Sequence, residues 1–322
     1  MSAALQPAWS DLESESLVDL ADELAAIAAA RLRVARHEPQ LLPRGSLLPD
    51  ARTTFLLFGG GSTPVAVAQI ASSTEPDAVA RAVARADAIR FALTPSEAEP
   101  ILAPLAIGAL DGLSYGVWPW CRPLSGATGS WRERRALAAP AFAWLDAIAK
   151  RTVRPAADEQ VRTRVDRPLC RLATDSRLSV RVRLAARGAL VRLDRGTWRP
   201  LHVASHGDLH AGNLLLDPLQ PGAAHFRVID WGGAALDGFP MYDVVRLAHS
   251  LRLDARHFGH RVLTHAAQLG FAPADARWHL AAAFADLGAS LEHFPPDRWA
   301  ALADLSFELL ETALAAVGGA TA

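Results

Sequence analysis

Two short polar segments, each bordered by apolar runs, constrain this chain more than any other feature. The first reads HGDLHAGN over residues 206–213, and the second reads VIDWGG over residues 228–233. Three runs beside them have the length and composition of β-strands: HVAS at 202–205, NLLLD at 213–217 and HFRVID at 225–230. The last two read as partners across a turn at Pro221 and Gly222. The polar side chains are therefore expected on loops at strand ends, where reactive groups are commonly held.

The spacing of three polar side chains in these segments suits phosphoryl transfer. That reaction needs one carboxylate at the attacking hydroxyl and oxygen ligands for the magnesium that accompanies the nucleotide phosphates. Asp208 lies five residues before Asn213, which is the separation of the base and the amide ligand in a kinase catalytic loop, and Asp230 ends the next apolar run. We predict that Asp208 accepts the hydroxyl proton, that Asn213 and Asp230 hold Mg²⁺, and that His206 braces the loop.

This combination resembles the aminoglycoside phosphotransferase and choline kinase family, the small-molecule branch of the protein-kinase-like fold, whose signature is H-x-D-x-x-x-x-N followed by I-D-[WF]. Five residues downstream look like that family's D-G-x-P-x-Y-D segment: Asp237, Gly238, Pro240, Tyr242 and Asp243. The motif resemblance is specific over about residues 202–250. It implies an α+β fold of two lobes, with a small antiparallel sheet in the first and mostly helices in the second. It also implies transfer of phosphate from ATP, with Mg²⁺, to a hydroxyl of a sugar, aminoglycoside or amino alcohol.

The local patterns of the first third of the chain fit such a sheet-containing lobe. A capping box at Ser10 and Glu13 precedes an amphipathic helix with one apolar face: Leu17, Leu20, Leu24 and Ile27. Strands are predicted at 53–58 and 64–71 around a glycine turn, then a helix over about 77–93, then two strands separated by Asp111 and Gly112. The glycines at 59–61 are explained by the turn, since no G-K-[ST] sequence follows them.

The remainder of the chain reads as mostly helical. Helices are predicted at 130–150, in two pieces between 158 and 194 broken near Pro168, and at 240–254, 257–269, 275–290 and 297–317. We therefore predict an N-terminal lobe at 1–121, a hinge at 122–129 and a helical C-terminal lobe at 130–322 that carries both motifs.

The predicted nucleotide-binding residues depart from the family pattern. The resemblance places the purine at the hinge, near Trp120 and Cys121. A kinase also places a lysine on its third strand, paired with an acid on the following helix. Here that strand reads VAVAQIA, so Gln69 takes the lysine position, with Asp87 as the best candidate for the acid. The single lysine, Lys150, lies past the hinge, so an arginine of the preceding loop, Arg44 or Arg52, is a candidate for the missing charge.

Two alternatives to an active kinase remain at this stage. The alternation of His206, Asp208 and His210 has the form of a zinc or iron hydrolase site, although it leaves Asn213 and the IDWGG segment without a role. A catalytically silent, kinase-shaped binding protein would explain the lost lysine, although it has no chemical need for Asp208, Asn213 and Asp230 together.

Composition limits the classes of partner and the cellular compartment to be expected for this protein. The formal net charge of −1 gives no electrostatic reason to expect nucleic acid or an anionic membrane as a partner. Cys121 and Cys170 lack partners at metal-ligand spacing and suggest reduced thiols in the core of a cytoplasmic protein. No apolar run approaches the roughly 20 residues that span a bilayer. A small-molecule acceptor is the expected partner, and its identity is not readable, because acids, aromatic residues and arginines such as Arg246 and Arg252 are mixed in the C-terminal segment.

Overall fold

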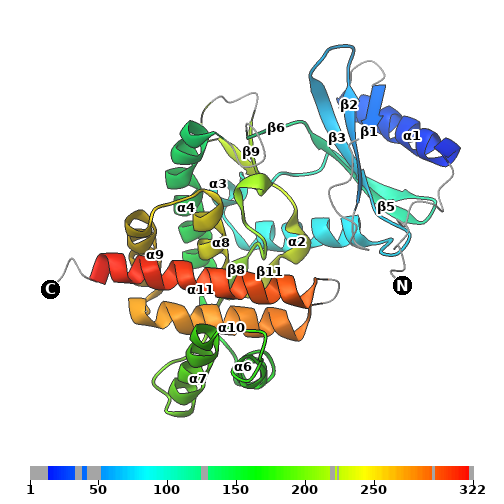
Figure 1. Cartoon of the computed structure of the whole chain (residues 1–322). Helices are drawn as coiled ribbons and strands as arrows, with labels where there is room; N and C mark the ends of the chain where they lie inside the picture. The colour runs from blue at the N-terminus through cyan, green and yellow to red at the C-terminus, as the bar shows by residue number, and fades with distance from the viewer. Residues whose placement is uncertain are drawn as a thin grey trace, which may run out of the picture. The chain divides into compact units, whose positions relative to one another are not determined.

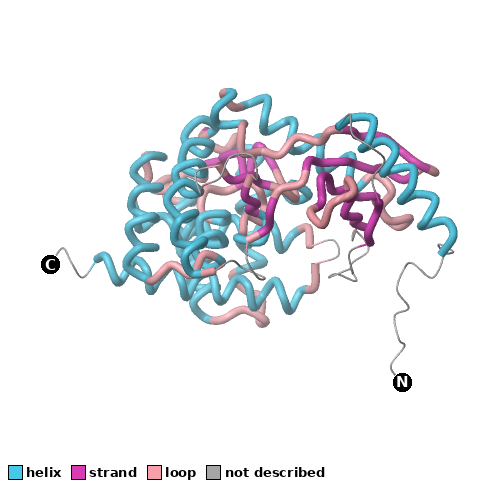
Figure 2. The backbone as a smooth tube through the Cα atoms, turned by 90° about the horizontal axis from the view of Figure 1, so that it is seen from above, coloured by secondary structure: helices cyan, strands magenta, loops and turns pink. Residues whose placement is uncertain are grey.

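A computed structural model describes residues 14–32, 38–41, 52–124, 130–217, 222, 225–291 and 294–318 of the chain. They form two compact units, one of residues up to 87 with 101–122, and one of 88–100 with the residues from 123 onward (Figure 1). Strands make up much of the first unit and helices most of the second (Figure 2). The prediction of an α+β fold, with a small antiparallel sheet in the first part and mostly helices in the second, is confirmed. The predicted boundaries at 121 and 130 stay a prediction, and the structure groups 88–100 with the second unit.

A five-stranded antiparallel sheet forms the centre of the first unit, with the strand order β1-β2-β3-β5-β4. Its strands are β1 (Glu38–Leu41), β2 (Thr53–Phe58), β3 (Pro64–Ile70), β4 (Ala106–Leu110) and β5 (Leu113–Pro119). Burial alternates along β2, as expected of a strand with one face on a core. The predicted hairpins β2–β3 and β4–β5 are both present.

One face of this sheet packs against helix α1 (Ser14–Leu32). Leu24 and Ala28 of the helix are fully buried together with Leu57, Ala66 and Ala68 of the sheet. The apolar stripe predicted for this helix therefore serves as core, as Leu20 and the half-buried Ile27 also show. The predicted capping box at Ser10 and Glu13 and the side chain of Leu17 lie outside the described residues. Helix α2 (Ala78–Ala92) spans the division between the units at residues 87 and 88, and β6 (Arg122–Pro123) spans the one at residues 122 and 123.

The helices of the second unit agree with most of the predicted ranges. They are α3 (Pro95–Ala98), α4 (Trp131–Thr152), α5 (Asp158–Gln160), α6 (Arg167–Leu172), α7 (Val180–Asp194), α8 (Tyr242–Ser250), α9 (Ala255–Leu269), α10 (Ala276–Ala289) and α11 (Pro296–Gly318). The predicted break near Pro168 is wrong. A π-helical segment, Val161–Asp166, runs directly into α6, and its wider turn accommodates the proline ring, which a regular helix would press against an earlier carbonyl. The break lies instead between Leu172 and Val180.

Short strands carry the two polar segments within this helical unit. Strand β8 (Leu201–Ser205) pairs antiparallel with β7 (Arg154–Pro155) and β11 (Ala235–Gly238). Strands β9 (Leu214–Leu216) and β10 (Phe226–Val228) pair antiparallel with each other, as predicted. The polar segments are thus held between strand ends, with the short 3₁₀ turns Ala211–Asn213 and Trp231–Gly233 inside them.

Two predictions from composition can be compared with the structure. Cys121 is buried, but Cys170 is exposed on α6, so the prediction of two core thiols is wrong for Cys170. Within the described ranges, no helix is both long enough and apolar enough to cross a membrane.

Candidate active site

The first polar segment begins with a buried histidine whose ring is fixed from several sides. His206 follows β8 and is 2% exposed. Its Nε2 lies 2.8 Å from the carbonyl oxygen of Ile229, and the N–H of Asp208 donates to its Nδ1 at 3.2 Å. These contacts place the ring proton on Nε2. The ring also lies 4.6 Å from that of Trp231, centroid to centroid. His206 therefore joins the two polar segments, and its role in catalysis stays a prediction.

The two segments also approach each other through their glycines. Gly207 has a φ of 80°, in the left-handed region, and a Cβ atom built on it would overlap the carbonyl oxygen of Gly233. Two independent constraints, backbone conformation and contact, thus require glycine at this position. The backbone of the predicted catalytic loop consequently packs directly on the WGG turn.

A buried carboxylate from α8 holds the loop from the opposite side. Asp243 accepts hydrogen bonds from the backbone N–H groups of His206 at 2.6 Å, Gly207 at 3.1 Å and Leu209 at 3.3 Å. Burial raises the pKa of Asp243, and these N–H donors together with the nearby His206 act against the rise. One side chain of the predicted D-G-x-P-x-Y-D segment therefore fixes the curvature of the loop.

Both carboxylate oxygens of Asp208 face a basic side chain. The guanidinium of Arg246, one turn after Tyr242 on α8, forms an ion pair with Oδ1. Nε2 of His210 lies 3.6 Å from Oδ2. The other ring nitrogen of His210 accepts the N–H of Gly212 at 3.0 Å, and burial lowers the pKa of this histidine. His210, to which the sequence assigns no task, thus lies beside the predicted base.

The two predicted metal ligands lie just beyond the adjacent ends of the paired strands β9 and β10. Asn213 is buried and precedes β9, and the N–H of Ile229 donates to its carbonyl oxygen at 3.1 Å, one residue before Asp230. The Nδ2 of Asn213 donates to the backbone carbonyl of Asp208 at 3.0 Å, which fixes the carboxamide and leaves Oδ1 for a cation. Asp230 is exposed and has left-handed backbone angles, with φ 65° and ψ 62°. One amide oxygen and one carboxylate are the ligand types that Mg²⁺ prefers, so these residues fit that ion.

The arrangement does not support the H-x-D-x-H hydrolase alternative. Both ring nitrogens of His206 are engaged with backbone groups, and His210 directs one nitrogen to Gly212. Across the described ranges, no group of three or more histidine, cysteine, aspartate or glutamate side chains is placed to hold a metal ion. The histidines of the loop therefore act as supports for its backbone.

A comparison of the sequence with models of known protein families identifies the family of this chain. The model of the family described as "Phosphotransferase enzyme family" matches residues 50–279, which is more than half of the chain. The chain belongs to this phosphotransferase family. The resemblance to aminoglycoside phosphotransferases and choline kinases is confirmed, and with it the assignment as a small-molecule kinase. No curated protein sequence matches the chain significantly.

Solved structures of the phosphotransferase family share its fold. A thermostable mutant of aminoglycoside phosphotransferase APH(4)-Ia, in a ternary complex with ADP and hygromycin B, is 18% identical with a TM-score of 0.53. That match covers 89% of this chain and 98% of the other. Choline kinase LicA from Streptococcus pneumoniae is 12% identical with a TM-score of 0.52, over 90% of this chain and 99% of that one. At sequence identities this low, the structural similarity establishes a common fold and nothing more.

In the first unit, the side chain of Gln69, which the sequence predicts at the position of the usual kinase lysine, makes few contacts. Gln69 lies on β3, opposite Thr54 and Gly116, on the sheet face away from α1. Its Nε2 lies 3.5 Å from the hydroxyl of Thr54, at the limit of a hydrogen bond. The ring of Trp118 covers Gly116 on the same strand pair, because a Cβ at Gly116 would overlap it. Gln69 therefore shares its face with an aromatic ring and a hydroxyl.

The other residues predicted to bind nucleotide differ in burial, from buried to exposed. The N–H of Trp120 donates to the carbonyl of Val65 at 3.0 Å, and Cys121 beside it is buried. Asp87 is exposed on α2, and Arg52 is half-buried immediately before β2. Arg44 lies outside the described residues. Their roles toward nucleotide stay predictions.

Two residues of the site have roles that the sequence pattern left unassigned. Asp243 is part of the recognised segment, but its contact with the loop backbone depends on where α8 begins. Arg246 reads in the sequence as one arginine among many. A signal was available, because Tyr242, Asp243 and Arg246 lie at helical spacing, which directs them to one side of a helix.

Proposed function

We propose that this protein transfers the γ-phosphoryl group of ATP to a hydroxyl group of a small molecule, with Asp208 as the base and Asn213 and Asp230 as ligands of Mg²⁺. The observation that carries the proposal is the shared anchoring of these three groups. Asn213 donates from its side chain to the backbone of Asp208 and accepts at its own backbone from Ile229, next to Asp230. These two hydrogen bonds support the proposal, because phosphoryl transfer requires mainly that base and metal ligands be positioned together.

Each of these residues would have a separate task. The acceptor oxygen bonds to the γ-phosphorus while the bond from that phosphorus to the bridging oxygen breaks, and ADP departs. Asp208 receives the hydroxyl proton, and the backbone of its loop is held by Asp243 and His206. Asn213 and Asp230 would hold Mg²⁺, which when bound neutralises phosphate charge.

Calorimetric titration with ATP, with and without Mg²⁺, tests this proposal most simply. We expect the metal to strengthen ATP binding in the wild type and to do so much less in Asn213→Ala and Asp230→Asn. A silent binding protein could also take up ATP, so the same samples should be assayed for Mg²⁺-dependent ADP release with sugars, amino alcohols and aminoglycosides as acceptors. Absence of ATP binding, or ATP binding without ADP release for every acceptor tried, would contradict the proposal.

A further inference from the structure

The base proposed above is already engaged by side chains of its own protein. Asp208 is 45% exposed at its side chain, whereas Arg246, which pairs with its Oδ1, is only 22% exposed. His210 faces the second oxygen at 3.6 Å. A hydroxyl group that approaches Asp208 would therefore meet a carboxylate whose two oxygens are directed at basic groups. An acceptor group that draws the guanidinium away would free Oδ1 of Asp208 for the hydroxyl proton.

Arg246 has binding capacity that the ion pair does not use. Its Nε–H is buried and has no hydrogen-bond acceptor within the part of the chain that the structure describes. A guanidinium offers a planar fork of N–H donors that matches a carboxylate or a phosphate better than it matches a single oxygen. The side chain thus has both the unpaired donor and the charge to take up a second, better-fitting anion.

The end of α8 extends this positive region away from Asp208. His249 lies in the last turn of α8 and Arg252 lies just beyond the helix end. Burial, together with the charges of Arg246 and Arg252, lowers the pKa of His249. The hydroxyl of Ser250 accepts the N–H of Ala211 at 2.9 Å, so this turn of helix is joined to the catalytic loop.

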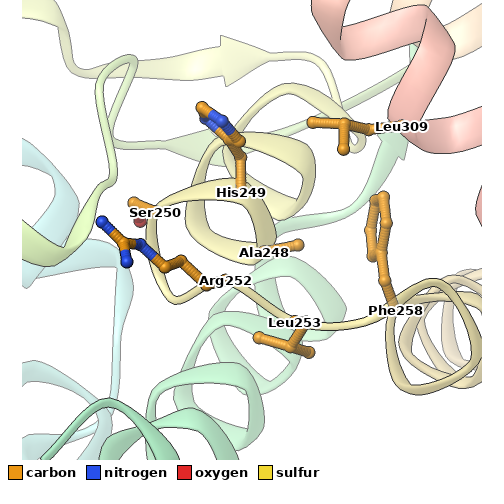
Figure 3. A pocket seen from close by; sticks show the side chains of 7 residues that line it. All are labelled: Ala248, His249, Ser250, Arg252, Leu253, Phe258 and Leu309. Carbon is orange, nitrogen blue, oxygen red and sulfur yellow. The ribbon is translucent and has the colours of Figure 1, made fainter. Parts of the chain in front are cut away.

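A pocket of about 380 Å³ opens at the same helix end. Figure 3 shows Ser250 and Arg252 on one side of it, opposite Phe258 and Leu309. A positively charged side and an apolar side suit an organic anion and disfavour a cation.

We propose that the acceptor of this kinase is a hydroxylated anion, bearing a carboxylate or a phosphate, and that Arg246 is its specificity-determining residue. The inference rests on the proposed function and goes further by naming the substrate class. The acidic group of the acceptor pairs with the guanidinium of Arg246, which withdraws it from Asp208, and the acceptor hydroxyl takes the vacated place at the base. An aminoglycoside or choline-like cation would be repelled by Arg246 and would leave its ion pair with Asp208 in place.

Matched acceptors that differ in charge test this proposal. ADP release by the full chain with Mg²⁺ and ATP is measured against gluconate, glucose 6-phosphate, glucose and glucosamine, and against glycerate, glycerol phosphate, glycerol and ethanolamine. We expect at least one acid to exceed its neutral and amine counterparts in kcat/KM by about 10- to 100-fold, the range of one charge-assisted hydrogen-bonded pair. The carboxylate and phosphate members show which anion is used.

Variants of Arg246 assign the preference to this side chain. Arg246→Gln should abolish the advantage of the acid mainly through KM, and Arg246→Lys should restore part of it because it keeps the charge without the planar fork. Arg256→Gln removes the same charge from an exposed position on α9. This control should change neither the advantage of the acid over its neutral counterpart nor the KM of the acid. Thermal unfolding of each variant checks that the fold persists.

The outcomes separate this inference from the function on which it rests. Preference for the neutral or amine members, an acid preference that survives in Arg246→Gln, or a protein that binds Mg²⁺ and ATP yet neither binds nor phosphorylates any acid would overturn the inference. A protein that binds no ATP and releases no ADP with any acceptor would contradict the proposed function instead.

Discussion

The loop at residues 206–213 in the second unit and the middle of strand β3 in the first unit are held by very different numbers of side-chain contacts. Backbone groups of the loop are bonded to Asp243, His206, Asn213 and Ser250, so almost every turn of it is fixed by a side chain. The side chain of Gln69 on β3 makes one long contact of 3.5 Å with Thr54. Several side chains thus fix the backbone of the loop, whereas the side chain at position 69 on β3 has few contacts that restrict it.

This contrast shows where the chain tolerates change. A base must be placed within a fraction of an ångström, because misplacement reduces the rate steeply. A charge that holds a phosphate acts over a longer range and can come from another side chain. If Gln69 stands at the lysine position as predicted, we expect the enzyme to tolerate that change, whereas we expect disruption of the loop to abolish activity.

The largest effect is expected at the anchor of the loop. Asp243→Ala leaves three backbone N–H groups without their acceptor in a buried place, so we expect the free energy of unfolding to fall by about 3 to 5 kcal/mol. Asp304→Ala is the control, because Asp304 accepts one backbone N–H, from Ser179, and should cost about 1 kcal/mol without loss of activity. Denaturant unfolding measures both, and equal costs would show that the loop is not specially held.

Removal of the base should reduce turnover strongly without loss of nucleotide binding. Asp208→Asn keeps the shape of the side chain but cannot take the proton, so kcat should fall at least the roughly 100-fold typical of a lost general base, about 2.7 kcal/mol. ATP affinity should stay within about twofold, because the base contacts the acceptor and not the nucleotide. Steady-state kinetics and calorimetry check the two parts, and wild-type turnover would refute the assignment.

Two glycines with the same backbone conformation separate strain from contact. Gly207 and Gly60 have φ angles of 80° and 84°, but a Cβ at Gly207 overlaps Gly233 while one at Gly60 meets nothing. Alanine at either site should cost about 1 to 2 kcal/mol through its backbone. Gly207→Ala should cost roughly 2 kcal/mol more through overpacking and should lower activity as well. Denaturant unfolding of the two variants gives the two losses in free energy of unfolding. Equal losses would mean that the two polar segments are not in close contact.

The smallest effect is expected on β3. Gln69→Lys should tighten ATP binding by at most about 1.5 kcal/mol, roughly tenfold, because a charge-assisted bond replaces a neutral one and part of the gain is lost in burying the ammonium group. Binding of adenosine should not change, since it has no phosphate. If Arg52 already supplies the charge, Gln69→Lys should gain little and Arg52→Ala should weaken ATP binding. No response in any variant would remove this strand from the nucleotide site.

The sequence predicted the parts of this molecule that local chemistry determines. The order and spacing of Asp208, Asn213 and Asp230 indicated the reaction, and alternation of apolar residues located the hairpins of the first unit. Turn residues such as Asp111 and Gly112 fixed where the strands reverse.

What the sequence did not reveal depends on packing between distant segments. The contact of Gly207 with Gly233 and the three bonds of Asp243 exist only once β8, β11 and α8 are folded together. The pairing of Arg246 with Asp208 joins residues 38 positions apart. Pro168 predicts a helix break from local sequence alone, whereas the π-helical turn before it, which the sequence pattern does not reveal, accommodates the proline ring. Exposure of Cys170 likewise follows from which side of α6 faces the core.

Identification of a phosphorylated acceptor tests the central claim most directly. The protein is incubated with Mg²⁺, ATP carrying an isotopic label in its γ-phosphate and a mixture of hydroxylated acids, sugars and amino alcohols, and products are separated by mass spectrometry. The account predicts a labelled phosphate ester with the wild type, almost none with Asp208→Asn and none without Mg²⁺. Label that appears equally with Asp208→Asn, or only as inorganic phosphate, would contradict transfer to a hydroxyl at this site.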